Sequence, residues 1–101
     1  MNNYPKVGQF YYHFKHSPEK GILDYCYKIV GVCQHTETSH LYVAYRPLYS
    51  NSLEENQLDF FIRPIEMFTE WVEKPELNYS GPRFTLIQDQ KLIVELENPY
   101  L

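Results

Sequence analysis

The stretch DYCYKIVGVCQ-HTETSH-LYVAYR, residues Asp24 to Arg46, decides the fold class. Its two outer runs, Asp24–Gln34 and Leu41–Arg46, are rich in the tyrosine, valine and isoleucine that favour β-strands. The polar residues between them, His35–Ser39, form a connection short enough to favour an antiparallel hairpin. Gly31 lies in the middle of the first run and predicts a bulge or bend there.

Similar runs outside this hairpin predict three further strands, at Gln9–Lys15, Leu58–Arg63 and Arg83–Ile87. The segments Tyr49–Asn56 and Lys74–Pro82 are predicted loops because they are polar or interrupted by proline and glycine. In the tail, Gln90–Leu101, an alternating apolar pattern allows one extra strand, through Leu92, Val94 and Leu96.

Pro64 marks a change of pattern after the fourth strand. A proline suits the first position of a helical turn, and the residues that follow, Ile65–Phe68, supply that turn. The next segment, Phe68–Val72, fits either a continued helix or a strand, because it has apolar residues at both spacings. We favour one helical turn followed by a strand.

Five or six short antiparallel strands with one helical turn predict an all-β domain, a small SH3-like bent barrel. A chain of 101 residues forms a single domain and has no room for a second core. Aromatic residues make up 17% of it and supply an efficient core for so short a chain. Six tyrosines either serve that core or line a groove for a proline-rich peptide, nucleobase or sugar: Tyr11, Tyr25, Tyr27, Tyr42, Tyr45 and Tyr49.

Charge and composition exclude several classes of protein. The net charge of −4 disfavours binding to nucleic-acid phosphates, which requires a cationic surface. No apolar run is long enough to span a membrane, and Met1–His13 lacks the apolar centre of a signal peptide. Cys26 and Cys33 are too far apart along one extended segment, and on opposite faces, to bond to each other. We therefore expect both to be reduced and mostly buried, in a cytoplasmic protein.

Five short pieces of sequence occur in an order that resembles a known family. They are Tyr12-His13-Phe14-Lys15, Gly31-Val32 with His35-Thr36-Glu37-Thr38, Tyr45-Arg46 with Leu48-Tyr49, Arg63-Pro64 with Met67-Phe68, and Pro82-Arg83-Phe84. From Gly8 to Ile87 the chain resembles the bacterial domain-of-unknown-function 1653 family. The resemblance implies a small β-barrel-like fold and a cytoplasmic protein, and it brings no established activity or substrate. Two loops, His16–Leu23 and Ser50–Gln57, are longer than the family pattern, and residues 88–101 form an extension.

Three arginines, Arg46, Arg63 and Arg83, each lie beside a proline. A following proline holds the arginine backbone extended, and a guanidinium group can contact a carboxylate or phosphate through two hydrogen bonds. We predict a ligand-binding surface at one end of the barrel, from His35, Glu37, Tyr45, Arg46, Arg63 and Arg83. The alternative is that Arg46 and Arg63 pair internally with one of three carboxylates, Glu37, Glu66 or Glu70.

The sequence favours a non-enzymatic binding module whose tyrosines and arginines contact a peptide, a protein or a small anionic ligand. The alternative is a small enzyme acting on a nucleotide-like or other anionic substrate, with His35 as general acid–base and Glu37 orienting it. A third possibility is self-association through an edge strand or the C-terminal tail. We expect no cofactor, and neither a membrane nor nucleic acid as a partner. We also expect no metal, since His35-x-Glu37 lacks the downstream Pro-Cys-x-x-Cys of zinc deaminases.

Overall fold

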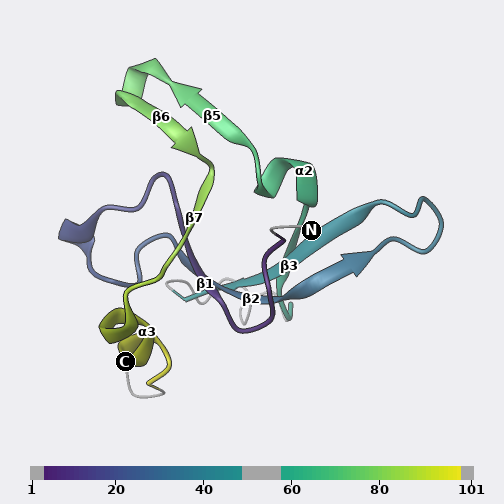
Figure 1. Ribbon diagram of the computed structural model, residues 1–101, viewed down its shortest axis with the longest axis horizontal. Coiled ribbons are helices and arrows are strands. Elements are labelled where there is room, and N and C mark those ends of the chain that lie inside the picture. Colours follow the sequence, from purple (N-terminus) through teal and green to yellow (C-terminus); the bar gives the residue numbers. More distant parts are fainter. Residues whose placement is uncertain (1–3, 49–57, 99–101) are drawn as a thin grey trace.

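The computed structural model describes residues 4–48 and 58–98, which form seven strands in two antiparallel sheets. The larger sheet has the order β4-β3-β2-β1-β7, and β5 pairs with β6 in the smaller one (Figure 1). The strands are β1 (Phe10–His13), β2 (Cys26–Gln34), β3 (Leu41–Pro47), β4 (Phe61–Pro64), β5 (Trp71–Lys74), β6 (Tyr79–Pro82) and β7 (Phe84–Leu86). Two helices, α2 (Ile65–Phe68) and α3 (Gln90–Leu96), and two 3₁₀ turns, Pro18–Lys20 and Pro75–Leu77, complete the described elements.

The mainly β fold class is confirmed, although the strand count exceeds the five or six that the sequence predicts. The first and last strands of the larger sheet, β4 and β7, pair with one neighbour each, so the predicted barrel is not closed. No helix in the described part of the chain is long and apolar enough to cross a membrane. The predicted loop Tyr49–Asn56 lies outside the described residues.

The predicted hairpin is confirmed as β2 and β3, which pair from Tyr27↔Pro47 to Gln34↔Leu41. The register shifts between Ile29 and Gly31, which is the irregularity that the glycine predicted. Cys26, at the start of β2, is fully buried, and burial raises the pKa of its thiol to about 12. Cys33 is exposed. The prediction that both are buried is therefore wrong for Cys33, because its half of the hairpin extends past β1 and is covered on one side only.

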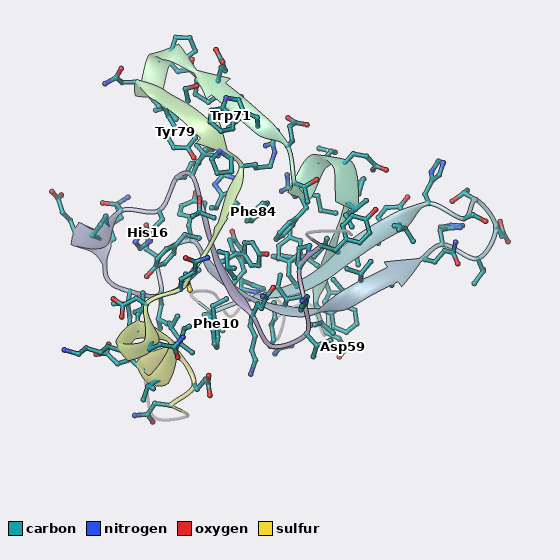
Figure 2. The ribbon with its side chains drawn as sticks, viewed as in Figure 1. Phe10, His16, Asp59, Trp71, Tyr79 and Phe84 are labelled. Carbon is teal, nitrogen blue, oxygen red and sulfur yellow. The ribbon has the colours of Figure 1, made fainter. Side chains whose placement is uncertain are left out.

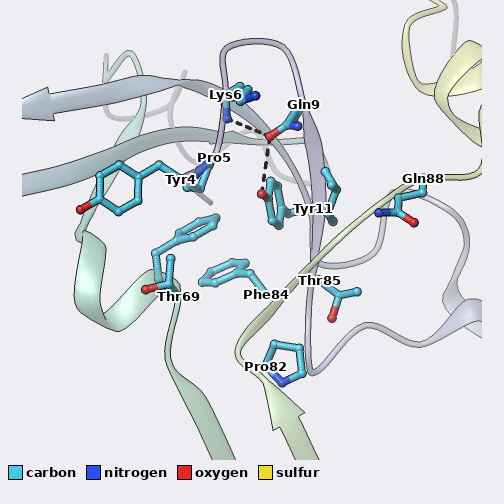
Figure 3. A pocket seen from close by; sticks show the side chains of 12 residues that line it. Tyr4, Pro5, Lys6, Gln9, Tyr11, Thr69, Pro82, Phe84, Thr85 and Gln88 are labelled. Atoms are coloured by element: carbon cyan, nitrogen blue, oxygen red, sulfur yellow. Dashed lines mark hydrogen bonds between the residues drawn. The ribbon is translucent and has the colours of Figure 1, made fainter. Parts of the chain in front are cut away.

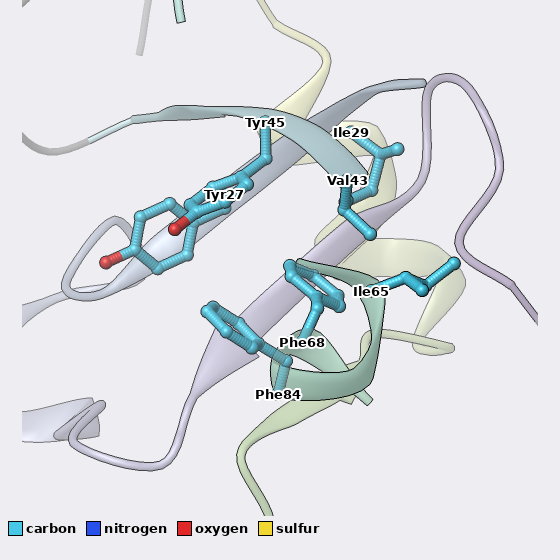
Figure 4. Packing of buried hydrophobic residues seen from close by; sticks show 7 residues of the cluster. All are labelled: Tyr27, Ile29, Val43, Tyr45, Ile65, Phe68 and Phe84. Carbon is cyan, nitrogen blue, oxygen red and sulfur yellow. The ribbon is translucent and has the colours of Figure 1, made fainter. Parts of the chain in front are cut away.

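The main core packs α2 against the larger sheet. The single helical turn after Pro64 is confirmed, and the chain then forms β5 rather than continuing as a helix. Phe68 of α2 stacks on Phe84 of β7 with ring centres 4.0 Å apart, and the Tyr45 ring meets both edge-on (Figure 4). The cluster consists of Tyr27, Ile29, Val43, Tyr45, Ile65, Phe68 and Phe84. Four aromatic residues therefore build this core: Tyr27, Tyr45, Phe68 and Phe84.

The predicted loop over Lys74–Pro82 is wrong, because most of it forms the turn and second strand of the β5–β6 hairpin. Asn78 makes the turn in the left-handed region, with φ 52°. Tyr79 folds back so that its hydroxyl donates to the Pro82 carbonyl at 2.6 Å, and a Cβ on Gly81 would lie 2.6 Å from that hydroxyl. Gly81 and Pro82 therefore belong to a strand here, β6, in a two-stranded sheet (Figure 2).

The extra strand allowed in the tail is also wrong, since the tail forms α3. Asp89 caps this helix by accepting hydrogen bonds from the main-chain N–H groups of Lys91 and Leu92, at 3.0 and 3.4 Å. Leu96 belongs to a second buried cluster with three residues of the sheet and its continuation: Phe10, Cys26 and Ile87. The helical spacing of Leu92, Ile93 and Leu96 places them on one face, and this outweighs the two-residue alternation.

Candidate functional site

A groove of about 570 Å³ lies between β7, the end of α2 and the segment that precedes β1 (Figure 3). Its apolar lining comes from Tyr4, Pro5, Tyr11, Phe68, Pro82, Phe84 and Leu86. Tyr11 meets Phe68 edge-on, with ring centres 5.3 Å apart. The Gln9 side-chain oxygen accepts from the Lys6 main-chain N–H at 2.8 Å and from the Tyr11 hydroxyl at 3.5 Å. These hydrogen bonds fix the polar end of the groove beside its aromatic floor.

The outer edge of β7 borders this groove. Phe84, Thr85 and Leu86 all line it, and consecutive strand residues point to opposite faces, so the groove follows the edge of the strand rather than one face. Toward β1, the Arg83 carbonyl accepts from the Phe14 N–H at 3.0 Å, and the Ile87 N–H donates to the Phe10 carbonyl at 2.9 Å.

Main-chain groups of a strand alternate in direction, so those of Phe84 and Leu86 point away from β1. No described residue hydrogen-bonds to them on that side. The β7 edge therefore presents two N–H and two C=O groups that are free to pair with another strand.

A second cavity, of about 490 Å³, gathers cationic side chains at the other end of β1. Four of them line it, Lys15, Arg63, Lys74 and Arg83, together with His13. They come from different parts of the chain, which the sheet and the β5–β6 hairpin bring together. This cavity is called the cationic pocket below.

The two arginines of the cationic pocket are held in different ways. The Arg63 Nε donates to the Tyr45 hydroxyl at 3.2 Å, and its guanidinium lies 5.4 Å from the centre of the Phe84 ring. Arg83 is held by Glu70, whose carboxylate accepts from Nη2 at 2.7 Å and whose carbonyl accepts from the Arg83 main-chain N–H at 2.8 Å. Both guanidinium groups are therefore positioned before any ligand arrives.

His13 is kept neutral by its surroundings. Burial, and then the charges of Arg63, Lys15 and Arg83, lower the pKa of its imidazole from 6.5 to about 4. Its Nδ1 accepts from the Lys15 main-chain N–H at 3.1 Å, which places the proton of the neutral ring on Nε2. Near pH 7 the ring therefore adds a neutral donor to a cationic wall.

The lowered pKa of His13 predicts a loss of stability in acid. Between pH 6.5 and about 4 the unfolded chain binds a proton at His13 that the folded protein does not, so stability falls as the pH falls. Allowing for solvent screening, we expect the wild type to lose about 1–2 kcal/mol more than His13→Gln over this range. Urea denaturation at several pH values measures this difference. The exposed His40→Gln is the control and follows the wild type; equal slopes for His13→Gln and the wild type would refute the prediction.

A family model described as a protein of unknown function, DUF1653, matches residues 9–86 of the 101. The chain belongs to the DUF1653 family. The matched span runs from β1 to β7 and leaves α3 outside, so both cavities are built mainly by DUF1653 residues. No curated protein matches the chain, and no solved structure does.

Within the DUF1653 span, three of the six predicted ligand-binding residues lie together. Arg63 and Arg83 line the cationic pocket, and Tyr45 holds Arg63 from the core side. Arg46 lies on β3 and donates to the Asp59 carbonyl. Of the three carboxylates offered as internal partners for Arg46 or Arg63, one, Glu70, pairs instead with Arg83.

His35 and Glu37 lie at the exposed tip of the β2–β3 hairpin, away from both cavities of the DUF1653 domain. The His35 Nδ1 accepts from the main-chain N–H groups of Glu37 and Thr38, at 3.2 and 3.3 Å. This nitrogen therefore caps the turn. Binding of a ligand by these two residues stays a prediction.

Sequence reasoning missed most residues of both cavities. His13 and Lys15 stand in the first piece that resembles DUF1653, which was the available signal, and Lys74 had none. The unpaired groups of β7 depend on sheet order, which the sequence does not reveal. In the described ranges, 4–48 and 58–98, no three histidine, cysteine or acidic side chains gather as metal ligands.

Proposed function

We propose that this protein is a peptide-binding module that adds an extended peptide to the outer edge of β7. The observation that carries the proposal is the unpaired main-chain edge at Phe84 and Leu86, which opens onto an aromatic groove. Strand addition of this kind takes its affinity from main-chain hydrogen bonds and its specificity from pockets for alternate side chains.

The lining of the groove supports one class of peptide. Tyr4 and Tyr11 are only partly buried and offer aromatic surface to one apolar side chain of the peptide, above the buried rings of Phe68 and Phe84. Thr85 and Gln88 at the rim offer polar contacts to the residues on either side. Lys6 is the one charged residue among those described in the lining. Because it is positive and the described lining has no carboxylate, we expect the groove not to require a basic peptide.

Selection from a random peptide library, followed by fluorescence anisotropy with synthetic peptides, tests the proposal. Leu86→Pro removes an outward N–H without removing a bond to β1, since proline is tolerated at a strand edge. We expect it to weaken binding at least about tenfold, the effect of about 1.4 kcal/mol. Thr85→Trp, at an exposed rim position, fills the groove and should also weaken binding while leaving β7 intact.

The opposite edge of the sheet provides the matched control. Ile62 lies on β4, is 57% exposed and faces neither cavity, so Ile62→Lys should bind the peptides as the wild type does. Amide exchange supplies a direct readout, since peptide binding should slow exchange at Phe84 and Leu86 more than at Thr85, which already pairs with β1. Unchanged binding by both β7 variants, or self-association of the protein through this edge, would overturn the proposal.

A further inference from the structure

The cationic pocket carries an excess of positive charge on an acidic protein. Its four cationic side chains face two carboxylates, Glu70 on Arg83 and Glu76 in the lining, which leaves two positive charges. The whole chain has a net charge of −4. Cations gathered against this background create a local field that attracts a compact anion.

Each arginine of this pocket keeps nitrogen donors that no described residue pairs. The Arg83 Nε is buried and has no hydrogen-bond partner among the described residues, and leaving a buried donor unpaired is unfavourable. Arg63 uses its Nε on Tyr45, and the described residues offer its two terminal nitrogens no acceptor. Within the described ranges, Arg83–Glu70 is the one salt bridge, so Lys15 and Lys74 also have no acidic partner there.

We propose that the cationic pocket binds the phosphate group of an anionic ligand through Arg63, Arg83 and Lys15. A dianionic phosphate matches the excess of two positive charges, whereas a carboxylate would neutralise half of it. Its oxygens can accept from several guanidinium and ammonium donors together, the geometry in which arginine binds phosphate best. No residue lines both this pocket and the groove, so the site goes beyond the peptide-binding function and stands without it.

NMR of the histidine side chains reports on this site directly. An anion in the pocket offsets the charges of Arg63, Lys15 and Arg83, which hold down the pKa of His13. Inorganic phosphate is a monoanion over the pH range in which His13 titrates, so with saturating phosphate we expect the His13 pKa to rise by about half a unit or more, relative to sodium chloride of equal ionic strength. His35 and His40, both on the exposed β2–β3 hairpin, are internal references and should not shift.

Three probes separate the sources of the anion. Inorganic phosphate tests the charged group alone, phenyl phosphate tests a phosphate monoester, and acetate tests a carboxylate. We expect both phosphates to bind at least about tenfold more tightly than acetate at pH 7.5, since doubling the charge strengthens the attraction to the pocket. Tighter binding of phenyl phosphate than of inorganic phosphate would assign the site to phosphate esters, and the reverse to free phosphate; either supports the proposal.

Variants locate the binding. Arg63→Met should weaken phosphate binding at least about tenfold, the loss expected when a charged hydrogen-bonding partner is removed. The matched control is Arg46→Met, another arginine before a proline, which lies outside the pocket and should leave binding unchanged. Lys15→Met gives a second test at an exposed side chain, where folding is not at risk.

Three results would overturn the proposal. One is an equal His13 shift in chloride and phosphate, which would show general screening of charge. Another is acetate binding as tightly as phosphate. The third is wild-type affinity for phosphate in both Arg63→Met and Lys15→Met. None of these results bears on the peptide groove, whose variants lie on β7.

Discussion

Replacing Phe68 with alanine is expected to lower the free energy of unfolding by about 3–5 kcal/mol. Phe68 is 1% exposed, stacks on Phe84 at 4.0 Å and meets Tyr11 and Tyr45 edge-on. Removing its ring leaves a cavity among rigid aromatic neighbours, which cannot collapse to fill it. A domain of this size has about 5–15 kcal/mol of stability in total, so this one substitution should remove a large share of it.

Trp71→Ala is the matched control for Phe68→Ala. Trp71 also has a large ring, but it is 64% exposed and its indole N–H meets the Ser80 hydroxyl at 3.3 Å on the surface (Figure 2). Its loss should cost less than about 1 kcal/mol. Urea denaturation followed by circular dichroism measures both values. Similar losses for the two variants would mean that the α2–β7 contact does not hold the main core together.

The parts of the fold that the sequence predicts are those that local chemistry determines. The β2–β3 hairpin follows from two strand-forming runs and a short polar turn, and Gly31 marks its irregularity. Likewise Pro64 ends β4 and opens α2. In each case the residues that form the element also determine it, so a window of about ten residues is sufficient.

Two elements differ from the sequence prediction, β6 and α3, and both depend on side-chain contacts that the spacing of apolar residues does not show. Gly81 and Pro82 usually signal a loop, and they belong to a strand here because the Tyr79 ring folds over the glycine and its hydroxyl bonds to the proline carbonyl. In the tail, two-residue and helical spacings compete, and the helix forms because it can cover Phe10 and Cys26. Tertiary burial decided the tail, whereas the exposed contact of Tyr79 with Pro82, three residues along the same strand, accompanies β6. The spacing of apolar residues contains neither contact.

The candidate site also has a part that local sequence predicts and a part that depends on the fold. That arginines beside prolines are positioned for an anion is a local inference, and it selects Arg46, Arg63 and Arg83 alike. That Arg63 and Arg83 share a pocket, whereas Arg46 lies elsewhere, depends on the order of strands and on the β5–β6 hairpin. His35 was singled out for its acid–base chemistry, yet its Nδ1 is occupied by two main-chain N–H groups of its own turn. The His35 side chain, a candidate general acid–base by sequence, therefore accepts hydrogen bonds from its own turn.

Leu96→Asp is expected to lower the free energy of unfolding by about 3 kcal/mol or more, since a buried apolar side chain is lost and a charge is placed in its position. Leu96 is 7% exposed and packs in one cluster with Phe10, Cys26 and Ile87. Its helix, α3, follows β7 (Figure 1). If α3 were a loose appendage beyond the family span, which ends at residue 86, the substitution would have little effect.

Val94→Asp separates a helical tail from an extended one, because Val94 lies on the same helix but is 68% exposed. In an extended tail, residues 94 and 96 would share one face, and both substitutions would have similar effects. In a docked helix, Val94→Asp should change stability by less than about 0.5 kcal/mol. Urea denaturation gives both values on one scale. A large loss for Leu96→Asp beside a small one for Val94→Asp requires a helix with one buried face, whereas equal losses would contradict the docking of α3 and the closure of the second core.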